Sequence, residues 1–270
     1  MKSSEDRYMS QKWGPPNSDF VEEAKRILKA ADERGVTLRL MGALASRMHC
    51  QEYAYIQKVL GRPFSDIDFA SYSQFRGGIE ELFRELGYVY DEMAAKVFMA
   101  EFGYVGRLTY EDQINKRHID VFFDKLEFSH DIPLKGRLEV DSPTIPLAEL
   151  LLTKMQIVKL NEKDIIDTVM LLREHEVGET DKETINARHI AKLCAADWGL
   201  WKTVTTNLKT TMELLLTFAK LNDDDKIDVN MKIQRVLNYI NEEPKPLSWK
   251  MRAKIGEKIK WYRDVEAITR

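Results

Sequence analysis

The chain has 270 residues, of which 44% are apolar and 31% charged, an ordinary composition for a soluble globular protein of one large or two modest domains. The formal net charge of −3 provides no overall basic excess that would recruit nucleic acid. Cys50 and Cys194 lie far apart and match no metal or redox spacing, which is typical of a thiol-reduced protein. No apolar run reaches the roughly 18 residues of a membrane span, and the polar N-terminus lacks a signal-peptide pattern. We therefore expect a cytoplasmic protein without a membrane partner.

The first part of the chain alternates between helical and strand patterns. Residues 1–17 are polar and end in a Gly-Pro-Pro turn, which predicts a flexible arm closed by a helix cap at Ser18 or Asp19. The spacing of apolar residues then predicts helices and strands in the following order: a helix at 20–35, a strand at 36–41, a helix at 43–61, a strand at 64–72 and a helix at 78–88. This order of elements indicates a mixed α/β fold.

The chain changes character near residue 130. Apolar, aromatic segments at 96–110 and 117–128 flank a polar turn and predict two neighbouring strands, as in a hairpin. Helical patterns fill the rest of the chain, at 141–160, at 161–178 and from about 183 in three or four amphipathic helices broken at 222–226 and 241–246. The sequence therefore predicts an α/β domain at 18–141, with a mixed sheet and flanking helices, followed by an all-helical domain at 142–270.

Three aspartates lie inside apolar strand patterns. Asp66 and Asp68 are one residue apart in S-D-I-D-F, so their side chains point to the same face of a strand while Ile67 points to the other. Asp120 stands in the same setting in H-I-D-V-F-F. If the two strands are neighbours, three carboxylates converge on one face of the sheet.

Carboxylates held this close repel one another. Each ionised pair at about 4 Å costs about 4 kcal/mol at the effective dielectric constant of a protein surface. Either one carboxylate takes up a proton or a cation enters. Sets of oxygen ligands suit Mg²⁺ or Mn²⁺, and Mg²⁺ is usually bound by a few carboxylates together with substrate phosphates. The pattern therefore predicts metal-assisted phosphate chemistry.

Each of these features also has a plain structural explanation. A D-x-D pattern alone is typical of a solvated strand edge. Gly42, between a strand and a helix, lets a phosphate approach the backbone at a helix N-terminus, but it also suits an ordinary strand-to-helix turn. Arg62, four residues before Asp66, is placed either to reach phosphate oxygens or to remain exposed in a loop. His118 shares the face of Asp120 and is either a substrate contact or a partly buried strand histidine.

The order of these motifs resembles the nucleotidyltransferase fold of the DNA polymerase β superfamily. A strand ends in Gly42, a helix follows, R-P-F-S-D-I-D carries two aspartates, and H-I-D-V-F-F on a later strand carries the third. Within that superfamily, the arginine before the first aspartate is most similar to the small stand-alone transferases related to the AbiEii abortive-infection toxins. Lys154 and the K-D-I-I-D segment at 163–167 extend the similarity. The resemblance spans about half of the chain, from residue 36 to residue 172.

The resemblance implies a set of site residues and a cofactor. Asp66 and Asp68 would hold Mg²⁺ or Mn²⁺, and Asp120 would complete the catalytic and metal site. The nucleotide-binding positions that it implies are Gly42, Ala43, Arg62, Ser65 and Lys154. The chain departs from the family at Ala43, where a glycine or serine is expected, so a serine hydroxyl to phosphate is lost. Lys154 also has a structural alternative, because a lysine on an apolar helix often only extends to the surface.

The resemblance implies transfer of a nucleoside monophosphate from an NTP to an acceptor hydroxyl or phosphate, with release of pyrophosphate. The acceptor is not identified; an aminoglycoside-like sugar, a protein side chain and an RNA end are the options, and a toxin role with an antitoxin partner follows from resemblance alone. A catalytically degenerate member that binds nucleotide or a partner is the first alternative, supported by Ala43. A carboxylate-rich metal phosphohydrolase, which would release phosphate, is the second.

Overall fold

The computed structural model describes residues 12–102 and 106–264. Most of the predicted N-terminal arm, at residues 1–11, lies outside the described residues. The chain divides into two compact units, and each is formed from separate stretches. The first unit comprises Met1–Met48, Phe64–Lys125 and Pro133–Ile145, and the second comprises His49–Pro63, Leu126–Ile132 and Pro146–Arg270. The fold is mixed α/β with a mixed sheet and many helices, as predicted.

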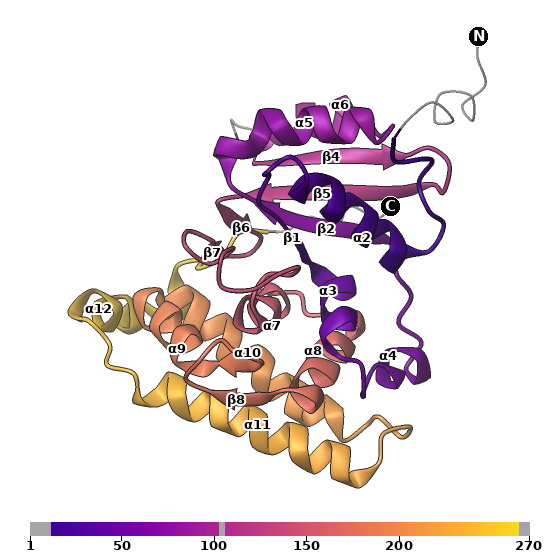
Figure 1. The fold of residues 1–270 in the computed structure, drawn as a ribbon. Helices are drawn as coiled ribbons and strands as arrows, with labels where there is room; N and C mark the ends of the chain where they lie inside the picture. Colours follow the sequence, from indigo (N-terminus) through magenta and orange to yellow (C-terminus); the bar gives the residue numbers. More distant parts are fainter. Residues whose placement is uncertain (1–11, 103–105, 265–270) are drawn as a thin grey trace. The chain divides into compact units, whose positions relative to one another are not determined.

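A five-stranded sheet forms the centre of the first unit (Figure 1). Its spatial order is β1-β2-β5-β4-β3, and its strands are β1 Leu38–Met41, β2 Asp66–Ser71, β3 Val89–Tyr90, β4 Arg107–Asp112 and β5 Arg117–Phe123. The pair β2–β5 is parallel, whereas β1–β2, β4–β5 and β3–β4 are antiparallel. The predicted strands at the two aspartate motifs are therefore neighbours, and the predicted hairpin is confirmed as β4–β5.

One face of this sheet belongs to the hydrophobic core. Helix α5, Arg76–Glu85, packs on this face through Phe83, whose ring stacks on Tyr110 with centroids 4.4 Å apart and meets the edge of Phe69. Helix α2, Phe20–Asp32, packs against β1 and α5, and it begins at the predicted N-cap Asp19, whose carboxylate accepts two backbone N–H groups. The core side fixes the register of β2, so its other side chains are directed to the opposite face.

Helix α6, Glu92–Phe102, occupies a stretch for which the sequence predicts a strand from residue 96. This prediction is wrong at residues 96–102. Asp91 begins the helix by accepting the N–H of Ala94 at 2.9 Å, and Met, Ala, Glu and Lys in the segment favour helix. The apolar, aromatic composition had suggested a strand because a short apolar run does not distinguish the two.

The helix predicted at 43–61 is broken in two. Helix α3, Gly42–His49, ends before residue 50, and helix α4, Tyr55–Val59, begins after it. In between, the N–H groups of Glu52 and Tyr53 donate to the carboxylate of Glu174, at 3.3 and 2.8 Å. These backbone groups are therefore satisfied by a distant side chain rather than by helical carbonyls.

The second unit is predominantly helical, and its helix α7, Leu147–Met155, is buried on nearly every side. In α7, every residue except Lys154 is buried, as expected of a helix surrounded by other helices. This unit also contains α4 and, after α7 in the chain, α8 Glu162–Glu174, α9 Ala187–Ala196, α10 Trp198–Leu215, α11 Asp223–Glu242, α12 Leu247–Ile255 and the 3₁₀ turn η2 Gly256–Lys258. The predicted breaks at 222–226 and 241–246 coincide with the ends of α11.

Short strands were not predicted among these helices. Strands β8, Glu176–Gly178, and β9, Thr184–Asn186, form a parallel pair. Earlier in the chain, β6, Lys125–Glu127, lies at the end of the strand predicted at 117–128 and pairs with β7, Asp131–Pro133, which was not predicted. Each of these strands has three residues, which is too short to produce an alternating pattern in the sequence. Within the described residues, no helix has both the length and the apolar character required to cross a membrane.

Candidate functional site

The three strand aspartates lie on one face of the sheet of the first unit. In the parallel pair β2–β5, Asp68 lies directly opposite Asp120, and Asp66 lies opposite His118. Side chains that are opposite each other in a register, or two residues apart along a strand, share a face. The convergence predicted for these carboxylates on one face is therefore present in the sheet. Asp66 is exposed, Asp68 is half-buried, and Asp120 is buried.

Asp120 is held by two residues of β4 that the sequence did not single out. Thr109, its cross-strand neighbour, donates its hydroxyl to Oδ1 of Asp120 at 2.5 Å. Nη1 of Arg107 lies 3.6 Å from Oδ2 of the same carboxylate. The guanidinium of Arg107 also stacks on the ring of Phe98, 4.4 Å from its centroid. These contacts fix the orientation of Asp120 and partly balance its charge.

Gly42 lies directly against the carboxylate of Asp68. It ends the segment after β1 and begins α3 with a φ of 71°, a conformation that favours glycine. A Cβ placed on Gly42 would lie 2.5 Å from Oδ2 of Asp68. Ala43 follows in the first turn of α3 and is buried, whereas Ser65 is exposed just before β2. The strand–glycine–helix motif and the first aspartate strand thus meet at one point.

The carboxylates of the three strand aspartates are not gathered closely enough in this structure to count as one ligand group. Among the residues that the structure describes, a single group of three potential ligand atoms lies within 4.8 Å of one another, and it comprises Asp91, Glu111 and His118. The carboxylates of Asp66, Asp68 and Asp120 do not form such a group, so at least one pair of them is more than 4.8 Å apart.

The remaining predicted site residues lie in the second unit, where they form an ion-pair cluster. Nζ of Lys154 lies 3.0 Å from Oδ2 of Asp167 and 3.5 Å from Oδ1 of Asp164. Nη2 of Arg62 lies 3.1 Å from the same Oδ2 of Asp167, and the amide of Gln57 donates to Oδ1 at 2.8 Å. Lys154 and Arg62 thus have acidic partners within their own unit.

The opposite charges in this buried cluster compensate the cost of removing them from water. Burial raises the pKa of Asp167, but Lys154 and then Arg62 outweigh it and hold this pKa below its ordinary value. Burial likewise opposes the charge of Lys154, and Asp167 followed by Asp164 keeps the pKa of Lys154 above its ordinary value. Lys154 and Asp167 are therefore both charged at neutral pH, and their ion pair stabilises the contact of α7 with α8.

Comparison with known proteins finds only distant structural similarity. No protein-family model matches the chain, and neither does any of the curated proteins. Among solved structures, the chain is similar to the solution structure of the antibiotic-resistance factor ANT(2'')-Ia, an aminoglycoside nucleotidyltransferase. The identity is 19% and the TM-score 0.38, and the match covers 65% of this chain and 94% of the other.

Proposed function

We propose that the first unit carries the active site of a metal-dependent nucleotidyltransferase. One observation carries the proposal: Asp68 and Asp120 are directly opposed in adjacent parallel strands, and the carboxylate of Asp68 lies against Gly42 at the start of α3. Like charges in direct cross-strand opposition are destabilising, and a cation bound between them removes this repulsion. A glycine beside them leaves the backbone of a helix N-terminus open to phosphate.

The donor set fits a hard divalent cation. Asp66, Asp68 and Asp120 offer only carboxylate oxygens, the ligands preferred by Mg²⁺ and Mn²⁺. In the proposal, Asp66 and Asp68 hold the ion and Asp120 completes the set. The bound ion would neutralise charge on the triphosphate and on the departing pyrophosphate.

The chain's own residues would position the reactants and move one proton. The oxygen of an acceptor hydroxyl attacks the α-phosphorus of an NTP, and the bond from this phosphorus to the pyrophosphate oxygen breaks. The hydroxyl proton passes to the carboxylate of Asp120. Thr109, which donates to Oδ1, would hold this carboxylate in one orientation. Catalysis would rest on positioning and charge balance, as in phosphoryl transfer generally.

Gly42 and Ala43 would contact phosphate through the backbone of the first turn of α3. Because Ala43 has no hydroxyl, only its N–H is available for this purpose. Ser65 is exposed next to β2 and suits a role in the same nucleotide site. The nucleotide-binding roles of Arg62 and Lys154 stay predictions, since both are ion-paired with Asp167 in the second unit.

The acceptor is proposed only as a class, a hydroxyl or phosphate group on a small molecule, a protein or an RNA end. Aminoglycoside-like sugars, one of the acceptor classes proposed from the sequence, are the first group to assay. An antitoxin partner and a cytoplasmic location also belong to the proposal and are not needed for the reaction.

The proposal is tested by assaying pyrophosphate release and covalent labelling with each labelled NTP, Mg²⁺ and a panel of acceptors. We expect one NTP to support activity, and Asp66→Asn and Asp68→Asn each to lower it by at least about a hundredfold, a typical effect of losing charge stabilisation. Asp32→Asn at the exposed end of α2 is the matched control and should retain full activity. Full activity in Asp66→Asn would show that the reaction takes place elsewhere.

A second candidate is a non-catalytic nucleotide-binding protein of the same fold. It is favoured by the contact of Arg107 with Asp120, because this ion pair engages a carboxylate oxygen that catalysis would need. In this case calorimetry would detect NTP binding, but no pyrophosphate would be released from the NTP with any acceptor. A third result, release of phosphate rather than pyrophosphate, would identify a phosphohydrolase.

A further inference from the structure

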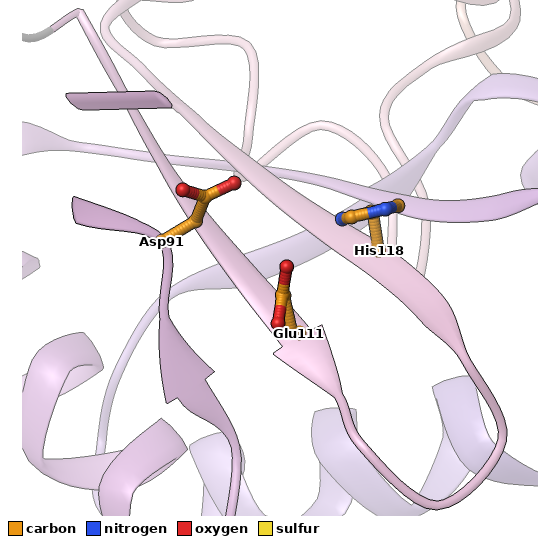
Figure 2. A group of neighbouring side chains, drawn as sticks. All are labelled: Asp91, Glu111 and His118. Carbon is orange, nitrogen blue, oxygen red and sulfur yellow. The ribbon is translucent and has the colours of Figure 1, made fainter. Parts of the chain in front are cut away.

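A second group of ligating side chains lies in the first unit, beside the three strand aspartates, since its His118 is opposite Asp66 in the β2–β5 pair. Asp91, Glu111 and His118 point toward one another, and one potential ligand atom from each lies within 4.8 Å of the others (Figure 2). All three side chains are half-buried. Asp91 and Glu111 were not singled out from the sequence, because the two acids are 20 residues apart and form no recognisable motif with His118.

Three elements bring these residues together. Glu111 of β4 lies directly opposite His118 of β5, so the two side chains share one face of the sheet. Asp91 follows β3 immediately, and its N–H donates to the carbonyl of Thr109 in β4 at 2.9 Å. Its Oδ1 accepts the N–H of Ala94 at the start of α6, also at 2.9 Å. The position of Asp91 is therefore fixed by its backbone and by one carboxylate oxygen, which leaves Oδ2 free of the helix cap.

Repulsion between the two carboxylates of the group favours the binding of a cation. Two carboxylates of like charge face each other at short range, and within the described part of the chain neither is paired with a lysine or an arginine. In addition, Nδ1 of His118 is buried and has no hydrogen-bond partner among the described residues. A buried polar atom without a partner is costly and calls for an explanation. A metal ion would account for both features, since it offsets the two charges and takes up a nitrogen lone pair.

We propose that Asp91, Glu111 and His118 form a binding site for a divalent transition-metal ion of the Zn²⁺ type. An imidazole nitrogen combined with two carboxylates suits Zn²⁺ and its first-row neighbours, whereas Mg²⁺ and Ca²⁺ prefer oxygen alone. Three protein ligands leave a position open for water or a substrate atom. Ligands about 2.0–2.2 Å from such an ion would be about 3–3.5 Å apart, so the half-buried side chains close around it by small rotations.

The test uses Zn²⁺ as the probe and a protein in which the strand aspartates are removed. In an Asp66→Asn/Asp68→Asn background, metal-stripped protein is titrated with Zn²⁺ by calorimetry. We expect a saturable site with one ion per chain, and a rise in the thermal midpoint through preferential binding to the folded state. His118→Gln and Glu111→Gln should each weaken binding by at least about tenfold, since even outer partners of metal sites have effects of this size.

Two further variants control for charge and folding. Asp91→Asn retains the oxygen that caps α6 and removes only the charge, so it should weaken Zn²⁺ binding without loss of helix in circular dichroism. Glu81→Gln removes an exposed acid of α5 outside the group and should bind Zn²⁺ as the background does. Equal Zn²⁺ affinity in the background and in folded Glu111→Gln, or no saturable site in the background, would overturn the proposal. The result is independent of nucleotide transfer, which is measured without Zn²⁺.

Discussion

At the scale of single residues, Gly42 has two separate reasons to be glycine. Its φ of 71° lies in the left-handed region, and the carboxylate of Asp68 occupies the space that a side chain would need. Gly35 has almost the same φ, 65°, but no atom lies within 4 Å of the Cβ position. Alanine substitutions at the two glycines therefore distinguish the free-energy cost of the backbone conformation from the cost of the clash with Asp68.

We predict that Gly35→Ala costs about 1–2 kcal/mol of unfolding free energy, the usual penalty for an L-residue in this region. Gly42→Ala should cost more, because Asp68 must also move. If nucleotide transfer takes place at this site, Gly42→Ala should abolish it while Gly35→Ala retains it. Urea unfolding and pyrophosphate release measure the two effects. Equal losses of stability in both variants would mean that Asp68 yields to the new methyl group without strain.

The residues of the candidate site differ in how far the sequence revealed them. Alternation within β2 placed Asp66 and Asp68 on one face, and this local rule needs no knowledge of the fold. The partners of Asp120 depend on the register of β4 against β5, which places Thr109 opposite it. A register of this kind is set by the turn and by the core face together, so Arg107 and Thr109 could not be identified from their own stretch of sequence.

At the scale of elements, the ion pairs of Lys154 connect α7 to α8. We predict that Lys154→Met lowers the unfolding free energy by about 3 kcal/mol, because it leaves Asp167 buried with less compensation. Lys159→Met, which removes an exposed lysine just after α7, should change stability by less than about 0.5 kcal/mol. Chemical denaturation of both variants gives the comparison.

NTP affinity of the same variants separates two roles of Lys154. If Lys154→Met loses NTP affinity but keeps its stability, the lysine serves a ligand and the ion pairs are incidental. If stability falls as predicted, the cluster has a structural function. A loss of both would mean that the lysine serves the second unit and the nucleotide together.

Among the elements, long periodic segments were predicted well and short or ambiguous ones were not. Helix α2 and the strands at the aspartate motifs follow from strong local patterns and a cap at Asp19. Helix α6 was taken for a strand because its apolar run fits both periods, and the decisive contact, the cap by Asp91, is a single hydrogen bond. The interruption after α3 depends on Glu174, more than 100 residues away, which no local pattern can indicate.

At the scale of the whole molecule, buried histidines make stability depend on pH. His130 is buried in the second unit with Nε2 2.8 Å from the hydroxyl of Thr203, and burial lowers its pKa. Arg263 lowers it further, whereas Asp197 and Asp131 act in the opposite direction. Burial, followed by the charge of His49, also lowers the pKa of His175 in the same unit. Both rings are therefore neutral in the folded protein.

The sign of the effect follows from these lowered pKa values. The unfolded chain takes up protons near the ordinary histidine pKa of about 6.5, whereas the folded protein takes them up only at lower pH. The stability contributed by the neutral rings is thus fully present above about pH 6.5 and is lost as the pH falls through the folded pKa values.

We predict a loss of at least about 1 kcal/mol of unfolding free energy between about pH 7.5 and about pH 5.5. Urea unfolding at the two pH values should show this loss, and the double variant His130→Gln/His175→Gln should lose most of the dependence. If the double variant keeps the full dependence, His130 and His175 are not its source, and the remaining histidines or the carboxylates, which also titrate in or near this pH range, are responsible.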